Sequence, residues 1–344
     1  MIVFGDHDQN TLDQFEDVRS RAIDAALMAD GHLGYVMPIG GVAAYDDRVS
    51  IVGVGFDIAC GNAAIRTDLN RDDLADLTAV ADEIFDSLSF GLGLSNLHDR
   101  APTDDPLFDD GRWDLVPKRQ RGGLLDKARN QLGTIGSGNH YVDIFEDQDG
   151  DVWVGVHFGS RGFGHTIASA FLAMSQGEPW GARAKEVEIL LHRQNPIGHD
   201  YWHLMNLAGR YAYAGREWVA RTVVELIGGE ELELVHNHHN FAWEENHGGR
   251  DVVVVRKGAT PAFPGQRGFI GGSMGDDAVI VQGATPSRGS ESAYRQREAL
   301  FSTVHGAGRV MSRTAAKGRW RKGELVKPGR VTHDMMRAWL DERN

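Results

Sequence analysis

The sequence is poor in cysteine and proline, with a single cysteine, Cys60, and 10 prolines in 344 residues. One cysteine cannot form an intramolecular disulfide, which favours a reducing compartment such as the cytoplasm. No apolar run approaches the ~20 residues that span a bilayer. The N-terminus also lacks the basic and then apolar pattern of a signal peptide. We therefore expect a soluble, cytoplasmic protein with no membrane partner.

Positive charge is scarce as well, since 49 Asp and Glu oppose 36 Lys and Arg, for a net charge of −13. Proteins bind nucleic-acid phosphates with Lys and Arg, so the total charge argues against such a partner. The distribution weakens that argument, because residues 301–344 carry 10 basic and 4 acidic side chains, whereas residues 1–110 carry 6 and 22. An acidic protein can still present a basic cleft to an anion, so a nucleic-acid partner is not excluded.

Glycine is in excess, with 43 residues where an average of ~7% would give about 24. Because proline is low, these glycines do not form a flexible linker. Glycine adopts left-handed backbone conformations and lets the chain approach a ligand closely, so the excess favours tight turns and loops that bind phosphates. The remaining composition, with 41% hydrophobic and 25% charged residues, is that of a globular protein with a sizeable core.

Hydrophobic periodicity predicts an alternation of helices and strands. We expect helices over 11–29, with Thr11 as the N-cap, and over 71–90, 183–193 and 202–227. Strands are expected over 140–146, 152–158, 251–256 and 278–282, with short apolar runs between turns at 33–67 and a polar loop at 95–120. There is no internal repeat and no low-complexity linker. The sequence therefore predicts an α+β (mixed α/β) fold. If the motifs below converge on one site, residues 1–344 form a single domain, although the length alone would also permit two.

Potential metal ligands lie in glycine-rich turns. GVGFDIACG offers Asp57 and Cys60, GSGNHY offers His140, VHFGSRGFGH offers His157, and HNHHNFAWEE offers His236, His238 and His239. Thiolate, imidazole and carboxylate ligands suit Mn, Fe, Co or Zn better than Ca or Mg. Taken singly, a buried cysteine or a hydrogen-bonded histidine is the more common explanation for each residue. At most two histidines of the last cluster can face one metal.

A second group of turns is suited to phosphates. The segments VVRKGATPAFPG, GGSMGDD and HFGSRG place Arg256, Lys257, Ser273 and Arg161 beside glycines. Consecutive backbone N–H groups in such turns bind anions, and arginine binds phosphate oxygens in bidentate fashion. An ordinary turn with a solvated cation is an equally good explanation of each segment alone.

His305 lies in a third pattern, STVHGAGRVMSR. A helix beginning near Gly308 would direct its N-terminus, Arg309 and Arg313 at an anion beside His305. A neutral imidazole, with a pKa near ~6.5, is a competent nucleophile towards phosphorus. A histidine that caps a helix is the alternative.

Taken together and in this order, the motifs resemble the RtcB family of RNA-splicing ligases. The matching segments are DGHLGYVMPIGGVAA (30–44), GVGFDIACG (53–61), GTIGSGNHY (133–141), VHFGSRGFGH (156–165), HHNFAWEE (238–245), RKGATPAFPG (256–265), GGSMG (271–275) and STVHGAGRVMSR (302–313). The resemblance implies a single-domain enzyme that uses GTP and two Mn²⁺ ions. Such an enzyme joins an RNA 3′-phosphate or 2′,3′-cyclic phosphate to a 5′-hydroxyl in tRNA splicing or RNA repair. Some lineages also use a small acidic activator, archease.

The resemblance also implies roles for individual residues. Asp57, Cys60 and His140 would hold one metal, and Cys60, as a bridge, would hold the second with His157 and His239. The nucleophile that forms the histidine–GMP intermediate would be His305, with Asp30 linked to catalysis. The implied nucleotide pocket consists of Asn139, Tyr141 (beside the guanine), Asp143, Asn240, Ser273, Gly306, Ala307, Gly308 and Arg309. RNA phosphates would contact Arg161, Lys257 and Arg313.

Three departures from the family pattern concern guanine recognition. Asp143 stands where the family often has Glu, and Ala278 stands where it often has Ser. The chain ends at Asn344, 39 residues after His305, where the family usually continues through a segment with a lysine that contacts the base. We therefore expect either a short or truncated member of bacterial type, or one that recognises guanine differently. Two alternatives remain, a two-metal phosphohydrolase or nucleotidyltransferase and a non-catalytic protein that binds RNA ends.

Overall fold

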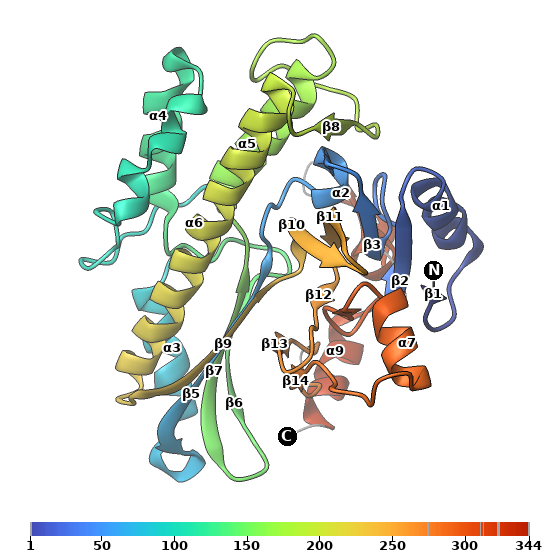
Figure 1. Ribbon diagram of the computed structural model, residues 1–344. Helices are drawn as coiled ribbons and strands as arrows, with labels where there is room; N and C mark the ends of the chain where they lie inside the picture. The colour runs from blue at the N-terminus through green and yellow to red at the C-terminus, as the bar shows by residue number, and fades with distance from the viewer. Residues whose placement is uncertain (1, 274, 310, 312, 322–323, 343–344) are drawn as a thin grey trace.

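A four-stranded antiparallel sheet organises one part of the computed structural model, which describes residues 2–273, 275–309, 311, 313–321 and 324–342. Its strands follow in the order β6 (Tyr141–Glu146), β7 (Asp151–Phe158), β5 (Gly61–Asn70) and β9 (Glu231–His238). The long helix α6 (Pro196–Leu226) crosses this sheet (Figure 1) and packs on β5 and β7. Buried Val and Ile side chains of the strands contact Val219 and Val223 of α6, which holds the helix on the sheet.

A five-stranded sheet organises the other part. Its order is β1 (Ile2–Val3), β2 (Asp24–His32), β3 (Ile39–Tyr45), β11 (Arg250–Lys257) and β10 (Asn240–His247), and only the β1–β2 pair is parallel. Helix α1 (Gln9–Arg19) packs against β2 through Phe15, and α7 (Glu291–Glu298) also contacts β2. The largest core cluster joins β3, β10 and β11 to α6 and to α5 (Arg161–Met174).

The two sheets are joined by one residue. Strand β9 ends at His238 and β10 begins at Asn240, so at this crossing a single residue, His239, separates a strand of the four-stranded sheet from a strand of the five-stranded one. Both its backbone neighbours are held in hydrogen-bonded ladders, and the His239 side chain is buried. This junction fixes the histidine between the two halves of the molecule.

Short elements complete the fold (Figure 1). Four strand pairs are β4 (Arg48–Ser50) with β8 (Leu190–His192), β12 (Thr260–Pro261) with β15 (Ser302–Thr303), β13 (Arg267–Ile270) with β14 (Val279–Gln282), and β16 (Gly318–Arg321) with β17 (Glu324–Pro328). The remaining helices are α2 (Ile51–Val54), α3 (Leu77–Ser87), α4 (Lys118–Gln131), α8 (Arg313–Lys317) and α9 (His333–Asp341), with 3₁₀ turns at Arg71–Asp73, Pro106–Asp109 and Gly111–Leu115. None of the helices in the described ranges is long and apolar enough to cross a membrane.

The expected α+β class is confirmed, as are the four predicted strands (now β6, β7, β11 and β14) and the helix over 202–227, which begins earlier, at Pro196. The helix expected over 71–90 is shorter and begins at Leu77. Part of the polar segment 95–120 forms 3₁₀ turns.

One helix prediction is wrong in its second half, and another is wrong throughout. The helix expected over 11–29 is confirmed as far as Arg19, but its N-cap is Asp8 and not Thr11, and residues from Asp24 onward pair with β3 as a strand. Residues 183–193 are not helical, since Leu190–His192 forms β8 against β4. In both places, pairing with a distant strand satisfies the backbone and overrides the local helical pattern.

Candidate active site

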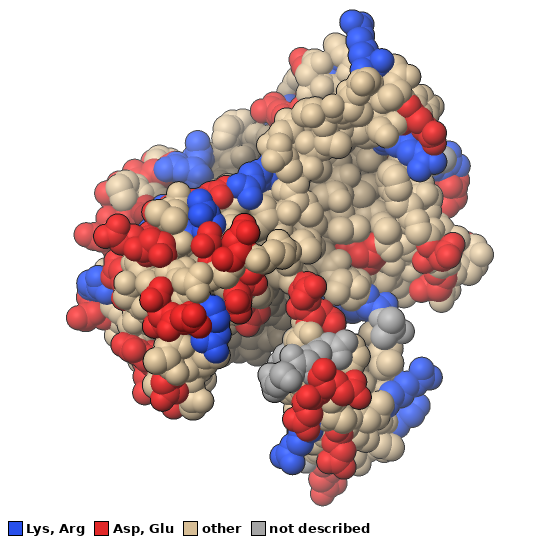
Figure 2. Space-filling model, turned by 90° about the horizontal axis from the view of Figure 1, so that it is seen from below, with Lys and Arg blue, Asp and Glu red and all other residues tan. Residues whose placement is uncertain are grey.

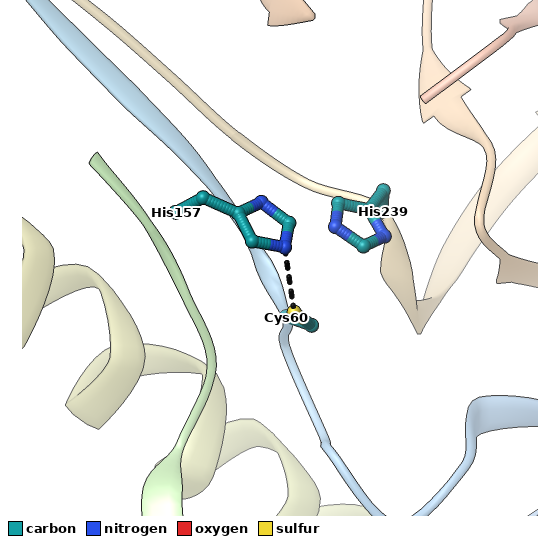
Figure 3. A group of neighbouring side chains, drawn as sticks. All are labelled: Cys60, His157 and His239. Carbon is teal, nitrogen blue, oxygen red and sulfur yellow. Dashed lines mark hydrogen bonds between the residues drawn. The ribbon is translucent and has the colours of Figure 1, made fainter. Parts of the chain in front are cut away.

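Strand register brings the candidate ligands together. Gly61, the first residue of β5, pairs with the last residue of β7 and with the last residue of β9. Cys60 directly precedes Gly61, His157 is the penultimate residue of β7, and His239 directly follows β9. These three side chains therefore meet at one edge of the four-stranded sheet (Figure 3), where His157 Nε2 lies 3.5 Å from Cys60 Sγ.

A second group shares the cysteine. His140 directly precedes β6, and its Nε2 lies 3.0 Å from Asp57 Oδ2 and 3.9 Å from Cys60 Sγ. The loop from Asp57 to Cys60 turns tightly because Ala59 adopts a left-handed φ of 59°. In each of the two groups, Asp57–Cys60–His140 and Cys60–His157–His239, all ligand atoms lie within 4.8 Å of one another. The structure thus forms two adjacent three-ligand groups with Cys60 in both.

The hydrogen bonds of the three histidines favour metal binding. His140 Nδ1 lies 2.9 Å from the Ile135 carbonyl oxygen, and His157 Nδ1 lies 2.5 Å from Asn62 Oδ1. An oxygen acceptor at Nδ1 keeps the proton there and directs the Nε2 lone pair to the shared site. Asn139 Nδ2 lies 3.1 Å from Nε2 of His157, and Asp57 Oδ2 lies 3.0 Å from Nε2 of His140. His239 has Asn240 Oδ1 3.3 Å from Nδ1, and its buried Nε2 has no hydrogen-bond partner among the described residues. Unpaired buried polar atoms are costly, so this Nε2 fits a ligand that a cation would satisfy.

The protonation of these ligands fits the same conclusion. Burial lowers the pKa of His157 to about 3 and that of His239 well below its usual value, so both imidazoles are neutral at pH 7. Burial and the neighbouring Asp57 carboxylate raise the pKa of the Cys60 thiol. A thiolate in this position needs a cation to stabilise it, as a metal would. The donor set of thiolate, imidazole and carboxylate suits Mn, Fe, Co or Zn.

His305 lies directly beside this group. Its ring centroid is 4.8 Å from that of His239, and its Nδ1 lies 2.7 Å from Asp30 Oδ2. The same carboxylate oxygen accepts hydrogen bonds from the backbone N–H groups of His305 (3.0 Å) and Gly306 (3.2 Å). Burial raises the pKa of Asp30, but its hydrogen bonds and attraction to His305 outweigh that effect and hold the pKa below the ordinary value. The ionised Asp30 carboxylate therefore faces Nδ1 of His305, and a proton on Nδ1 would leave Nε2 available as a nucleophile.

A cleft of about 930 Å³ contains this group and extends beyond it. Most of the residues that the resemblance assigns to the nucleotide line it. These are Asn139, Tyr141, Asn240, Ser273, Gly306, Ala307, Gly308 and Arg309, together with Lys257 from the proposed RNA contacts. The Tyr141 ring stacks on His157 with centroids 5.4 Å apart, so one face of this ring is already occupied.

Three sequence expectations differ from this geometry. Asp143 and Arg161 are not among the residues that line the cleft, and Arg161 instead points its guanidinium towards Thr134 Oγ1 and His140 Nδ1. The helix expected near Gly308 is wrong, because Gly308 is in a left-handed turn and α8 begins only at Arg313. A glycine with a φ of 72° stops a helix there. The Arg313 side chain lies outside the described residues.

Arg216 also belongs to this region, although no sequence motif indicated it. It is fully buried in α6, and its guanidinium donates to the carbonyl oxygens of Ala59 and Phe158 and contacts His236 and His238. This explains why His236 and His238 do not join the metal-ligand groups. A lone arginine in an amphipathic helix gives no sequence signal for such a role, because periodicity does not reveal a buried partner.

The site has the parts that a metal-dependent enzyme of phosphate chemistry needs, namely a shared cation site and a free imidazole lone pair beside a glycine-rich loop. Comparison with known proteins identifies the family. Residues 14–342 match the family model described as tRNA-splicing ligase RtcB. The chain therefore belongs to the RtcB family, as the ordered motifs indicated.

Three relatives illustrate this membership. The tRNA-splicing ligase RtcB of Thermococcus kodakarensis is 33% identical, over 88% of this chain and 77% of the relative. The tRNA-splicing ligase RtcB of Archaeoglobus fulgidus is also 33% identical, over 89% and 76%. The RNA-splicing ligase RtcB of Escherichia coli K12 is 32% identical, over 85% and 75%.

Proposed function

We propose that this chain is a GTP-dependent RNA ligase that joins an RNA 3′-phosphate to a 5′-hydroxyl. Family membership supports the ligase assignment. The single observation that carries the mechanism is the position of His305, which lies between the Asp30 carboxylate and His239 of the metal-ligand group. A protein that only bound RNA ends would not need a histidine prepared in this way as a nucleophile.

The first step is transfer of GMP to the protein. His305 Nε2 attacks the α-phosphorus of GTP, the bond from that phosphorus to the β-phosphate oxygen breaks, and pyrophosphate leaves. Asp30 keeps the Nδ1 proton in place and stabilises the positive charge that the imidazole gains. The backbone of Gly306–Arg309 and the nearby Ser273 line the cleft where the triphosphate would lie. Asn139, Tyr141 and Asn240 complete this part of the lining.

The second and third steps act on RNA. An oxygen of the RNA 3′-phosphate takes the GMP group from His305, and the 5′-hydroxyl oxygen then attacks the activated phosphorus and releases GMP. A 2′,3′-cyclic phosphate must first be opened by water to a 3′-phosphate. Lys257 lines the cleft as one cation for RNA phosphates. Contacts of Asp143, Arg161 and Arg313 with substrate stay predictions.

Two Mn²⁺ ions are part of this proposal. Asp57, Cys60 and His140 would hold one, and Cys60, His157 and His239 would hold the other. Bound cations would neutralise the charge that develops on phosphate oxygens. Because the same ligands also suit other transition metals, metal binding should be measured by titration of the metal-free protein with Mn²⁺, Zn²⁺ and Co²⁺. We also propose a reducing cytoplasm as the location, since a ligand thiol must stay unoxidised.

The decisive test is labelling with GTP that carries ³²P at the α-phosphate. The purified protein is incubated with this GTP and Mn²⁺, with and without an archease, and analysed by denaturing electrophoresis. We expect an acid-labile label that His305→Ala and Cys60→Ala abolish. His199→Ala, which removes an exposed histidine of α6, is the matched control and should label normally. Failure to label with any nucleotide would overturn the proposal and favour a phosphohydrolase or an RNA-end binding protein.

Asp30→Asn provides a sharper test of the nucleophile. The amide keeps the shape of the side chain but cannot hold the proton on Nδ1 as a carboxylate does. We expect the labelling rate to fall by about 100-fold or more, as it does when the carboxylate of a catalytic triad is replaced by an amide. Label that survives unchanged would exclude this role for Asp30. The labelled protein should then seal an RNA with a 3′-phosphate to one with a 5′-hydroxyl.

A further inference from the structure

We propose that the cleft contains a second subsite, which stacks the unpaired terminal base of an RNA strand against aromatic side chains. This subsite is walled by Tyr35, Phe56 and His165, none of which belongs to the metal or nucleotide groups described above. Naming RNA as the ligand rests on the proposed function. The aromatic wall and its connection to the catalytic cleft do not.

The wall is a continuous set of rings contributed by three segments far apart in sequence. Tyr35 packs edge-on against Phe56, with ring centroids 6.4 Å apart and an interplanar angle of 87°. Phe56 in turn contacts His165 of α5 at 5.7 Å and 36°. All three residues line the same cleft as Cys60 and His305. A base that enters this part of the cleft therefore meets π-faces beside the reacting groups.

The exposure of Tyr35 points to a ligand. This side chain is 70% exposed although it lines a cleft, so only part of its ring packs against the protein. An exposed ring anchored edge-on by a neighbour offers a rigid apolar face at low entropic cost. Stacking of a base on such a ring contributes affinity without demanding a particular sequence. A sequence-tolerant contact is what an enzyme that joins different RNA ends needs.

The polar groups around the rings suit a nucleotide. Lys257 Nζ lies 5.9 Å from the centre of the Tyr35 ring, and Arg183 lines the same cleft. These cations can contact the phosphate that follows the stacked base. Glu186 also lines the cleft, and its carboxylate can accept a hydrogen bond from a ribose hydroxyl or a base amino group. The subsite thus offers a stacking surface, cations and one acceptor.

The occupant could be the nucleotide that carries the 5′-hydroxyl or the one that carries the 3′-phosphate. Both ends present the same chemistry, an unpaired base with an adjoining phosphate. Short RNAs with 2-aminopurine at the 5′-hydroxyl terminus, at the 3′-phosphate terminus or at an internal position distinguish them. Stacking quenches the fluorescence of this base. We expect quenching for one terminal probe and little for the internal one, with the full-length protein free of GTP.

Variants connect the quenching to the wall. Tyr35→Ala should abolish it and weaken binding of the terminal probe by about 5- to 150-fold, the range for loss of one base–aromatic stack. Tyr35→Phe keeps the ring and should restore both signals. Tyr294→Ala removes a tyrosine that is 57% exposed on α7 and does not line the cleft, so it serves as the matched control. Thermal unfolding of each variant confirms that it is folded.

The two proposals fail in different ways. If the wild-type protein labels with GTP, but Tyr35→Ala quenches the probe and binds RNA as the wild type does, the proposed ligase function stands and the stacking subsite is refuted. If the protein does not label, but quenches a terminal probe in a way that depends on Tyr35, the subsite stands as an RNA-end binding site and the ligase mechanism is refuted. Equal quenching of the internal and terminal probes would also overturn the subsite, because a stacking position for terminal bases must distinguish them.

Discussion

Lys257 shows how burial can make one charge depend on pH. Its Nζ donates to the Val52 carbonyl oxygen at 2.6 Å inside the cleft, and burial lowers its pKa to about 8. A lysine with a lowered pKa is charged below that value and loses its proton as the pH rises through it. We therefore expect RNA affinity to fall by roughly tenfold or more between pH 7 and 9, the contribution of one charge-assisted hydrogen bond.

The measurement is a series of RNA dissociation constants in metal-free buffer at constant ionic strength. Lys257→Arg keeps its charge throughout this range and should remove the decrease near pH 8. Lys257→Met should bind weakly at every pH and show no decrease there. A wild-type profile that is flat from pH 7 to 9 would show that Lys257 does not contact RNA phosphates.

Gly159 is a residue whose lack of a side chain shapes the metal site. A Cβ atom added here would lie 2.1 Å from Asp57 Oδ1 and 3.0 Å from the Cα atom of Cys60. Gly159→Ala must displace the carboxylate, and we expect Mn²⁺ affinity to fall about 10- to 100-fold, as it does when groups that orient metal ligands are changed. Calorimetric titration of the metal-free protein measures this effect. Gly122→Ala, in open space on α4, is the control, and equal affinities in the two variants would contradict the prediction.

At the scale of elements, the sequence predicted the strands that carry the site better than the short helices around it. Residues 152–158 and 251–256 are apolar runs bounded by polar residues, and both form strands. Residues 22–30 gave no such distinction, because AIDAALMAD contains good helix formers whose conformation is decided by pairing with β3. The local pattern of apolar residues indicates which side chains prefer burial. It does not indicate which other segment will pair with them as a strand.

The candidate site shows the same limit. Motifs around Asp57, Cys60 and His140 pointed to the residues that the structure brings within ligand distance. They did not reveal Asn62, which orients His157 and is itself held by a hydrogen bond to the Phe269 carbonyl oxygen. They also did not reveal the wall around Tyr35, because its contacts join two separate loops and helix α5. Residue type indicates chemistry, but the supporting contacts depend on register.

The β10–β11 pair contains a buried ion pair that should be important for stability. Glu245 and Arg256 form two hydrogen bonds of 2.5 and 3.0 Å, with side-chain exposures of 7% and 0%. Removing one partner leaves the other buried and unpaired, so Glu245→Gln should lower the free energy of unfolding at pH 7 by roughly 3–5 kcal/mol. Glu244→Gln, which removes an exposed carboxylate paired with Arg193, should cost about 1 kcal/mol or less.

The pH dependence of this stability has a definite sign. Burial raises the pKa of Glu245, but the Arg256 charge and the hydrogen bonds from Arg256 and His247 hold it below the ordinary value. Such a carboxylate stabilises the fold above the unfolded-state pKa, about 4.3. Its contribution is lost as the pH falls through the lower folded-state pKa. Urea unfolding from pH 7 downward should therefore show a constant advantage over Glu245→Gln until about pH 4, and an advantage that declines already near pH 6 would contradict this assignment.

At the scale of the whole molecule, the two sheets meet at His239. The cleft is lined by residues that belong to, or adjoin, strands of both sheets. The protein around this cleft is acidic, with a net charge of −13. Figure 2 shows Lys and Arg scattered among Asp and Glu over the face seen from below. RNA binding should therefore depend on the few cations inside the cleft. Arg183, Lys257 and Arg309 line it.

The salt dependence of RNA binding counts these contacts. Each phosphate neutralised on a single strand contributes about −0.7 to the slope of log K against log salt concentration, so three contacts give a slope of about −2. We expect this value for a short 3′-phosphate RNA, measured by anisotropy in the absence of GTP. Arg183→Ala should reduce the slope by about 0.7, whereas Arg288→Ala, outside the cleft, should leave it unchanged. A slope of about −5 or steeper would contradict a cleft-only interface and would instead assign RNA contacts to the basic residues of 301–344, because these are the remaining concentration of positive charge in the sequence.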